Sequence, residues 1–316
     1  MKTLLHSPIW FFQLFTTAKS FSANPILGSP LLNRLGLHVL RVVLAHLVMQ
    51  SRMWLLHWRI DPADRKSFRE QGFIMKPNYF AADDFQRMEQ ELRHYQGHSR
   101  TYLQGDTRTL RTLLPPEALE QLPWTRKLLG NPALLRLLCY TNGHQRHPLF
   151  NTEQIFNGTR TGAGEDPQKK LHVDTFHPTM KFWLYLDDVD LHNGTFVYIP
   201  GSQRLSWKRL QWEYRMSIRA RTLPDLYATR GSFRVTEQDR QALGLPEPRA
   251  FAVPRNTLLI ANTFGVHGRG RADPGSTRLA LWGMGRTNPF LPFPGTGLPV
   301  FNRLQYRVLA WLENRK

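Results

Sequence analysis

A histidine and an aspartate two residues apart, His172 and Asp174, begin the most distinctive stretch of the sequence. On extended backbone, side chains two residues apart point to the same face of the chain. An imidazole and a carboxylate placed in this way can bind one metal ion. Because His-x-Asp triplets are common by chance, the pattern needs a third ligand from elsewhere in the chain before it indicates a site.

His267 is the candidate for that third ligand. The stretch 256–266 is largely apolar and predicts a buried strand that ends at this histidine, beside glycines. Two histidines and one carboxylate on one face of an octahedron leave three open positions, as in non-haem Fe(II) oxygenases. The next predicted strand, 276–284, carries Arg278, 11 residues after His267. Its guanidinium suits the distal carboxylate of 2-oxoglutarate, because the planar fork binds a carboxylate bidentately.

At these residues the sequence resembles the phytanoyl-CoA dioxygenase family of Fe(II)- and 2-oxoglutarate-dependent oxygenases. The resemblance covers roughly residues 68–286. Its most specific pieces are HVD at 172–174, NGTFVYIPGSQR at 193–204 and VHGRGRADPGSTR at 266–278, supported by the segments 68–92 and 123–138. The sequence departs from the family at Arg269, where the family often has a small residue.

The resemblance implies a mainly β fold with flanking helices, the double-stranded β-helix or cupin-like jelly roll. It implies that His172, Asp174 and His267 bind Fe(II), that 2-oxoglutarate and dioxygen take the open positions, and that Arg278 anchors the 2-oxoglutarate. The expected reaction converts 2-oxoglutarate to succinate and hydroxylates a substrate C–H bond. Asp174 favours hydroxylation over halogenation, because related halogenases lack this carboxylate.

Other residues could take part in such a site. Gln154 and Asn157 lie on a predicted strand before the metal-binding stretch and could bind the co-substrate, although an ordinary polar sheet face is slightly favoured. Arg286 is a second candidate for the anchor. His177 and His192 are weaker ligand candidates: the first lacks a carboxylate two residues on, and the second lies in a turn marked by Asn-Gly. We expect both at the surface or behind the ligands.

Composition narrows the class of partners. The net charge of +18 favours nucleic acid, anionic lipid or a phosphorylated substrate as partner. Hydrophobic residues make up 41% of the 316-residue chain, which is ample for the core of one elaborated domain. The single cysteine, Cys139, cannot form an intramolecular disulfide, so we expect a cytoplasmic protein and a buried, inert thiol.

Residues 1–60 form a basic amphipathic region. Residues 1–23 imitate a signal peptide but are interrupted by polar residues, so we do not expect export. In 31–60, apolar residues recur at helical spacing among arginines, and two tryptophans stand near the end. The charges interrupt it too often for a transmembrane span of about 20 apolar residues. Such a helix either lies in a membrane interface or packs on the domain; the net charge inclines us to the membrane.

The rest of the chain divides into an oxygenase domain, 61–290, and a C-terminal segment, 291–316, with a closing helix at 302–313. The arginine- and aromatic-rich segment 204–251 is expected near the cavity mouth, where it could bind an anionic head group; a solvated helical face is the equal alternative. Within the domain we expect strands at 72–76 and 153–160, a helix from 83 to about 95, two helices within 116–139, and loops at 98–115 and 161–170.

Three functions therefore fit the sequence. We favour hydroxylation of a small or lipid-linked, anionic substrate at a membrane surface. A nucleic-acid demethylase with the same triad is the second reading, although base-binding elements are not evident. The third is a jelly-roll protein that binds a ligand without turnover. No protein partner is indicated. Metal content and succinate release would separate an enzyme from a binding protein.

Overall fold

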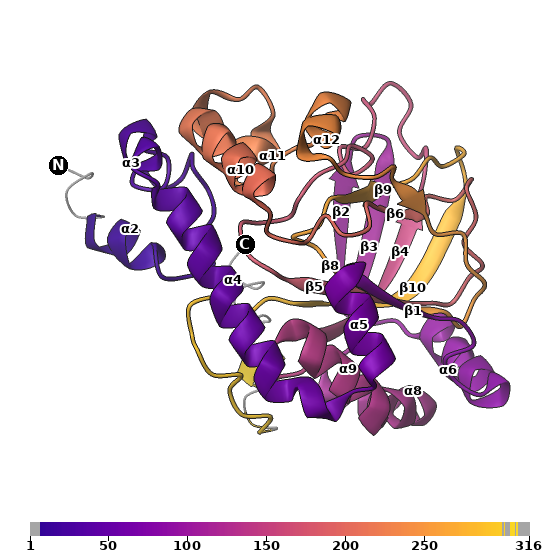
Figure 1. Cartoon of the computed structure of the whole chain (residues 1–316). Helices are drawn as coiled ribbons and strands as arrows, with labels where there is room; N and C mark the ends of the chain where they lie inside the picture. Colours follow the sequence, from indigo (N-terminus) through magenta and orange to yellow (C-terminus); the bar gives the residue numbers. More distant parts are fainter. Residues whose placement is uncertain (1–6, 299, 301–303, 307, 309–316) are drawn as a thin grey trace.

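Two antiparallel sheets form the centre of the computed structural model, which describes residues 7–298, 300, 304–306 and 308 (Figure 1). The larger sheet has the order β1-β8-β5-β10-β4-β3-β2, and the smaller has the order β7-β6-β9. The larger contains β1 (Phe73–Lys76), β2 (Ser99–Gln104), β3 (Thr107–Leu113), β4 (Leu149–Phe156), β5 (Met180–Tyr185), β8 (Leu258–Asn262) and β10 (Thr277–Gly285). The smaller contains β6 (Phe196–Tyr198), β7 (Arg249–Ala250) and β9 (His267–Arg269).

The chain crosses between the two sheets repeatedly. From β5 it passes to β6 and β7 in the smaller sheet, returns to β8, crosses to β9 and returns to β10. Every pair of neighbouring strands is antiparallel. This path is that of a double-stranded β-helix, as predicted.

Helices flank the sheets and occupy more of the described chain than the strands do. Several begin with a proline in the first turn, where its missing N–H costs nothing. They are α2 (Ser7–Gln13), α3 (Pro30–Arg34), α4 (Leu37–Leu56), η1 (His57–Arg59), α5 (Pro62–Glu70), α6 (Ala82–His94), α7 (Pro116–Glu120), α8 (Pro123–Leu129), α9 (Pro132–Asn142), α10 (Trp207–Arg219), η2 (Ala220–Thr222), α11 (Leu226–Thr229) and α12 (Glu237–Leu243).

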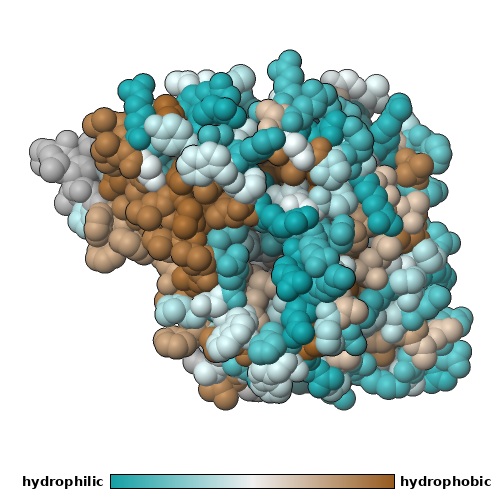
Figure 2. Space-filling model, viewed as in Figure 1, coloured by the Kyte–Doolittle hydropathy of each residue, from teal (hydrophilic) through white to brown (hydrophobic). Residues whose placement is uncertain are grey.

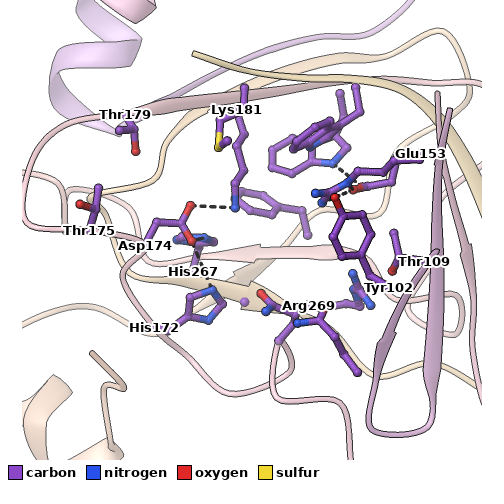
Figure 3. Close-up of a pocket in the computed structure, with 18 of the residues that line it drawn as sticks. Tyr102, Thr109, Glu153, His172, Asp174, Thr175, Thr179, Lys181, His267 and Arg269 are labelled. Atoms are coloured by element: carbon purple, nitrogen blue, oxygen red, sulfur yellow. Dashed lines mark hydrogen bonds and ion pairs between the residues drawn. The ribbon is translucent and has the colours of Figure 1, made fainter. Parts of the chain in front are cut away.

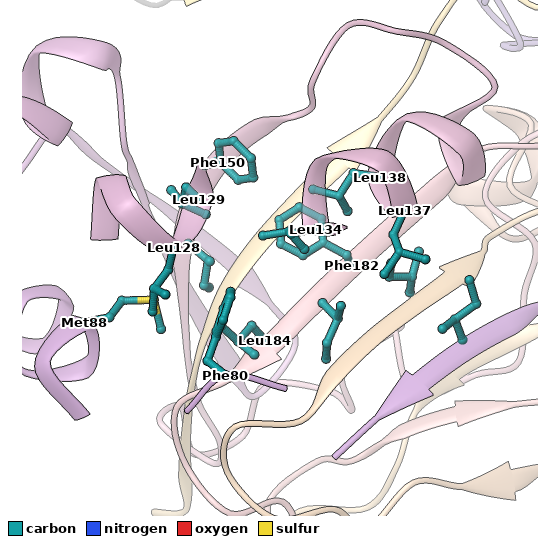
Figure 4. Packing of buried hydrophobic residues seen from close by; sticks show 14 of the residues in the cluster. Phe80, Met88, Leu128, Leu129, Leu134, Leu137, Leu138, Phe150, Phe182 and Leu184 are labelled. Atoms are coloured by element: carbon teal, nitrogen blue, oxygen red, sulfur yellow. The ribbon is translucent and has the colours of Figure 1, made fainter. Parts of the chain in front are cut away.

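Strand β5 shows how the sheet organises the core. Its side chains alternate, so Phe182 and Leu184 face the helices α6, α8 and α9 while Trp183 and Tyr185 face the space between the sheets. Figure 4 shows the outer cluster, in which leucines of α8 and α9 pack over Phe182 and Leu184. By the same alternation Lys181 faces inward. The apolar residues of β5 therefore contribute to two cores, one packed against the helices and one between the two sheets.

Several elements differ from the sequence expectation. Residues 98–115 are not a loop but the hairpin β2–β3, turning at Gly105 with φ 57°. In β3 the threonines at 107, 109 and 112 are buried and the residues between them are more exposed, so the exposed arginines hide the alternation that a strand requires. The stretch 116–139 contains three helices rather than two. His267 does not end the buried strand: β8 ends at Asn262, and His267 begins β9 in the other sheet.

The predicted closing helix, 302–313, lies mostly outside the described residues. Residues 304–306 and 308 are helical, and the Tyr306 hydroxyl accepts a hydrogen bond from the backbone N–H of Phe150 in β4 at 3.1 Å. The described part therefore contacts the beginning of β4, an inner strand of the larger sheet.

The helix α4 buries two arginines and two histidines together with apolar side chains, and it exposes several leucines. The buried face includes His38, Arg41, His46 and Arg52, and the Arg41 guanidinium donates to backbone carbonyls of residues 14, 16 and 18. Leucines and a tryptophan occupy the exposed face: Leu40, Leu44, Leu47, Trp54 and Leu55. The stretch Leu37–Arg59 is long and apolar enough to cross a membrane by length and composition. Its arginines nevertheless pack on the domain, so we describe it as a surface helix.

Candidate active site

His172 and His267 are brought together by the backbone itself. The N–H of His172 donates to the carbonyl of His267 at 2.8 Å, and the N–H of His267 donates back at 2.9 Å. Asp174 is fixed from the same side, because its N–H donates to the carbonyl of Thr263 at 3.1 Å. The loop before β5 therefore extends the smaller sheet and holds the three residues next to one another, although His267 is more than ninety positions from the other two in sequence.

The side chains converge on one point (Figure 3). Asp174 Oδ1 lies 3.7 Å from His172 Nε2 and 3.5 Å from His267 Nε2, and the ligand atoms of the three residues all lie within 4.8 Å of one another. Each Nδ1 contacts a backbone carbonyl, Lys170 O at 2.7 Å and Gly265 O at 2.9 Å. A carbonyl only accepts, so Nδ1 carries the proton and Nε2 offers its lone pair to the shared point.

The protonation states also suit a metal ion. Burial and the neighbouring His267 lower the pKa of His172 well below its usual value, so its imidazole is neutral. Burial alone would raise the pKa of Asp174, but Lys181 and the two histidines hold it well below its usual value. His267 Nε2 is buried with no hydrogen-bond partner. Two imidazoles and a carboxylate are the donor set of a non-haem Fe(II) centre, and a bound cation would satisfy the unpaired nitrogen.

The three residues line a cavity of about 290 Å³ between the sheets. Arg278, on β10, also lines it; the side chain is buried, donates to the carbonyl of Gly194 and lies 5.5 Å from the Tyr185 ring. Arg269 is the neighbouring guanidinium, but it donates to the buried carboxylate of Asp166 at 2.6 Å. Arg278 is therefore the better candidate for a carboxylate entering this part of the cavity.

Lys181 lies on the other side of Asp174. Its Nζ is 2.7 Å from Asp174 Oδ2, so the two carboxylate oxygens are divided between the lysine and the point where the histidines converge. Lys19, from the segment between α2 and α3, lines the same cavity and donates to the backbone carbonyl of Asp174. Burial lowers the pKa of Lys19 to about 8, against the opposing effect of Asp174. Arg286, just beyond β10, completes this side.

Two predicted co-substrate residues do not reach the cavity. Gln154 lies on the opposite face of β4, in a separate hollow with Leu92 and Arg93 of α6. Asn157 follows β4 and binds Ser276, its Nδ2 donating to the Ser276 hydroxyl at 3.1 Å. On β4 it is Glu153 that faces the cavity. We therefore leave Gln154 and Asn157 out of the proposed site.

The remaining sequence candidates serve the fold. His177 is buried next to Phe176, not at the surface, and does not line the cavity. His192 is exposed and lies 3.3 Å from Asp273. The aspartates at 187, 188 and 190 accept backbone N–H groups of residues 279, 255 and 192. Cys139 is buried, and burial raises the pKa of its thiol to about 11, as expected of an inert cysteine.

With the geometry in place, the sequence can be compared with known proteins. The family model of phytanoyl-CoA dioxygenase (PhyH) matches residues 68–231, just over half of the chain. The chain belongs to the phytanoyl-CoA dioxygenase family. Enzymes of this family depend on Fe(II) and 2-oxoglutarate, so this phytanoyl-CoA dioxygenase relative is an enzyme with those cofactors. The hypothesis of a non-catalytic jelly-roll protein is therefore rejected.

Solved structures resemble this family member at low sequence identity. The epimerase SnoN from nogalamycin biosynthesis is 17% identical over 71% of this chain and 83% of its own, with a TM-score of 0.47. The carbocyclase SnoK of the same biosynthesis is 16% identical over 72% and 84%, with a TM-score of 0.43. HygX from Streptomyces hygroscopicus, with nickel and 2-oxoglutarate bound, is 18% identical over 71% and 86%, with a TM-score of 0.42. No curated protein matches the sequence.

Sequence reasoning missed three charged residues of this phytanoyl-CoA dioxygenase relative. Lys181 could have been found, because it is the only charge in an apolar strand and shares the inward parity of Trp183. Glu153 binds Arg111 at 2.6 Å in the cavity wall. The sequence did not show which face of its strand points into the cavity. Lys19 gives no signal, since nothing around it indicates that its segment reaches the cavity.

Proposed function

We propose that the protein hydroxylates a C–H bond of an anionic, lipid or lipid-linked molecule. In this proposal His172, Asp174 and His267 hold Fe(II), and Arg278 binds the distal carboxylate of 2-oxoglutarate. The observation that carries it is the convergence of two Nε2 atoms and one carboxylate oxygen within 4.8 Å in a cavity lined by cationic side chains. Fe(II), when bound with 2-oxoglutarate and dioxygen, supplies the oxidising chemistry.

The chain's own residues position the reactants and restrict access of water. The carbonyls of Lys170 and Gly265 keep each Nε2 directed at the metal position. Lys181 keeps the second oxygen of Asp174 turned away from it. Trp183 of β5 and Phe196 of β6, whose ring centroids are 4.8 Å apart, form an apolar wall of the cavity and limit water near the reacting carbon.

A direct test measures iron-dependent release of succinate from 2-oxoglutarate. Replacing His172, Asp174 or His267 by Ala should abolish it while the thermal melting transition survives. Comparing lipid extracts with and without the protein should reveal a molecule that gains one oxygen. Full succinate release by His267→Ala would remove this site from consideration.

The exposed apolar face of α2, α3 and α4 supports a membrane surface as the place where the substrate is met. Figure 2 shows hydrophobic residues gathered over these helices. The described members of this patch, the N-terminal apolar face, are Ile9, Phe11, Phe12, Phe15, Leu31, Leu35, Leu40, Leu44, Leu47, Trp54, Leu55 and Trp58. Several are largely outside the fold: Phe12 is 68% exposed, Leu35 76% and Trp58 71%. Contiguous patches of this kind mark interaction sites.

Charge favours an anionic bilayer as the proposed occupant. The exposed Arg34 of α3 and the exposed Arg215 and Arg219 of α10, which packs on α3 and α4, lie beside the apolar face. Tryptophans at the end of α4 are typical of the headgroup region. The orientation differs from the sequence expectation, because Arg41 and Arg52 point into the protein and the leucines point outward.

We do not propose that the protein is a nucleic-acid demethylase. The basic segment 204–251 contributes no side chain to the cavity. Two of its arginines are buried and bound to carboxylates within the fold, Arg209 to Glu213 and Arg240 to Glu237. Its aromatic Trp212 is buried as well, whereas Trp207 is exposed.

A further inference from the structure

We infer that Lys19 and Arg286, with Lys181 behind them, form a subsite for an anionic group of the substrate, a carboxylate or a phosphate. The subsite lies where the iron cavity opens under the N-terminal segment. This inference deepens the proposed function and rests on it, because it names the part of the substrate that the cavity holds while a neighbouring carbon is oxidised.

Cationic side chains outnumber carboxylates in the lining of the cavity. Six are cationic, Lys19, Arg111, Lys181, Arg269, Arg278 and Arg286, and two are carboxylates, Glu153 and Asp174. Three of the cations have carboxylate partners: Arg111 binds Glu153, Arg269 binds Asp166, and Lys181 binds Asp174. Arg278 is the one that the co-substrate would neutralise. The positive charge of the other two remains.

The hydrogen bonds of Lys19 and Arg286 go to neutral acceptors. Lys19 Nζ donates to the backbone carbonyl of Asp174, and Arg286 Nη2 donates to that of Thr17 at 3.2 Å. A carbonyl satisfies a donor but does not cancel a charge. Once Asp174 binds a dication, the surroundings of these two side chains become more positive still. A substrate anion would supply the negatively charged contact that these two side chains lack among the described residues.

Both residues also line a second, more open hollow of about 680 Å³. This hollow is formed by residues 13–24 with Arg230, and it shares only Lys19 and Arg286 with the iron cavity. The two side chains therefore stand at the junction between the hollow and the metal position. A molecule that enters through the hollow meets them before it reaches Asp174.

The segment that carries Lys19 is held firmly in place. Arg41 of α4 donates to the carbonyls of Leu14, Thr16 and Ala18, and the N–H groups of Phe21 and Ser22 donate to the carbonyl of residue 229. Any side chain at residue 231 would lie 2.2 Å from the carbonyl of Lys19, so the glycine there permits this close approach. Lys19 is thus preorganised for binding, which reduces the entropy lost when a ligand binds.

The hollow also adjoins the N-terminal apolar face. Gln13, the last residue of α2, lines it, and the exposed Phe12 precedes it. An amphiphile whose chain contacts this face could place its charged end between Lys19 and Arg286. The subsite therefore favours an amphiphile with one anionic group over a neutral one of equal length.

Calorimetry can test this without turnover. The protein, loaded with Fe(II) and 2-oxoglutarate and kept free of oxygen, is titrated with decanoate, decyl phosphate or the neutral decyl maltoside, each below its micelle-forming concentration. We expect at least one anionic probe to bind and the neutral probe to bind far more weakly. The preferred anion identifies the head group as carboxylate or phosphate.

Lys19→Gln and Arg286→Gln should each weaken binding of that anion about tenfold, as expected for loss of one partly desolvated charge contact. Lys19→Arg should restore most of it. Lys66→Gln on α5 removes an equal, exposed charge away from the cavity and is the matched control. Melting curves identify any variant that does not fold. If one of the two glutamine variants does not fold, the test relies on the other.

The inference is overturned if neither anion binds the wild-type protein, if decyl maltoside binds equally well, or if both glutamine variants bind the anion as the wild type does. Failure of the proposed function has a different signature, the absence of iron-dependent succinate formation from the wild-type protein. Anion binding and succinate formation are measured separately, so one can fail without the other.

Discussion

Asp174 divides its carboxylate between two tasks. One oxygen faces the histidine Nε2 atoms, and the other binds Lys181 at 2.7 Å. Replacing Lys181 by Met keeps much of the bulk but removes the charge that orients the carboxylate. We expect metal affinity to fall about tenfold or more, as is usual when a partner behind a metal ligand is lost. Titration with Fe(II) or Mn²⁺ measures this directly.

Lys76→Met is a suitable control for that experiment, because Lys76 also binds a carboxylate, Asp64 at 2.8 Å, but on β1 and away from the cavity. Equal metal affinity in Lys181→Met and the wild-type protein would show that the ion pair does not orient Asp174.

Arg278→Lys tests the co-substrate anchor. The change keeps the charge but loses the planar fork, so the KM for 2-oxoglutarate should rise at least about tenfold while metal affinity stays unchanged. Steady-state succinate release gives the KM, and metal titration gives the second value. If the KM is unchanged in Arg278→Lys but rises in Arg269→Lys or Arg286→Lys, the anchor is one of those arginines instead.

The residues that sequence could identify share a property. His172, Asp174, His267 and Arg278 have fixed spacing within motifs, so type and position alone single them out. Lys19 has no such spacing, and its role depends on a contact between segments that are about 155 positions apart, which one sequence does not reveal. Gln154 agrees with the slightly favoured alternative of an ordinary polar sheet face: its type suited co-substrate binding, but it lies on the other face of β4.

At the scale of the element, α4 buries a histidine that makes stability depend on pH. His46 Nδ1 contacts the carbonyl of Val42 at 2.8 Å, and its ring packs 4.3 Å from that of Phe264. Burial lowers the pKa of His46 from 6.5 to about 4, helped by Arg209 and opposed by Glu213. Between these pH values the unfolded chain binds a proton that the folded chain does not, so stability falls as the pH falls.

The size of the effect follows from the shift. At pH 5 the protonation of His46 should cost about 2 kcal/mol of unfolding free energy relative to pH 7.5 or above. We therefore expect the unfolding free energy of His46→Leu to fall by about 2 kcal/mol less than that of the wild-type protein between pH 7.5 and pH 5. Urea unfolding at each pH measures this difference. His94→Leu, an exposed change on α6, should keep the wild-type dependence. Parallel losses in His46→Leu and the wild type would contradict this account.

The exposed face of α2 and α4 gives a prediction for membranes. Phe12→Glu combined with Leu44→Glu puts two negative charges on the N-terminal apolar face, where each wild-type side chain would gain about 2 kcal/mol on burial in lipid. The wild-type protein should float with anionic liposomes and the double variant should not, while both melt alike. Leu191→Glu, an equally exposed leucine in the β5–β6 connection, is the control.

High salt should release only part of the bound wild-type protein, because salt screens the arginine contribution and leaves the apolar contribution intact. If the double variant floats as strongly as the wild type, the membrane contact lies elsewhere on the molecule or does not exist.

How well elements were predicted depends on what covers them. The strands β1, β8 and β10 were predicted from sequence, because they are apolar and both of their faces are buried or nearly so. The hairpin β2–β3 is at the open edge of the sheet, where arginines and threonines replace the apolar pattern. The amphipathicity of α4 was evident, but which face would be buried was not, since buried arginines require partners that only the fold supplies.

For the whole molecule, the segment 7–60 contributes side chains to the core. Phe21 stacks on Phe233 at 5.4 Å, and His38 lies 2.8 Å from Glu213 of α10. A chain that begins at Asp61 would expose those surfaces and lose Lys19 from the cavity. We therefore expect it to precipitate or to melt far below the full chain, as measured by light scattering and thermal unfolding. A soluble truncation with full succinate release would make the N-terminal region dispensable.

The contact between Lys19 and the iron cavity has a consequence for protein engineering. The family match covers residues 68–231, so the segment 13–24 lies outside it. Randomising 13–24 while keeping the residues that anchor it would vary the opening of the cavity and leave the iron ligands unchanged. We therefore expect directed evolution of the remaining positions in 13–24 to alter the substrate scope of this enzyme, although none of these positions lies within the family match.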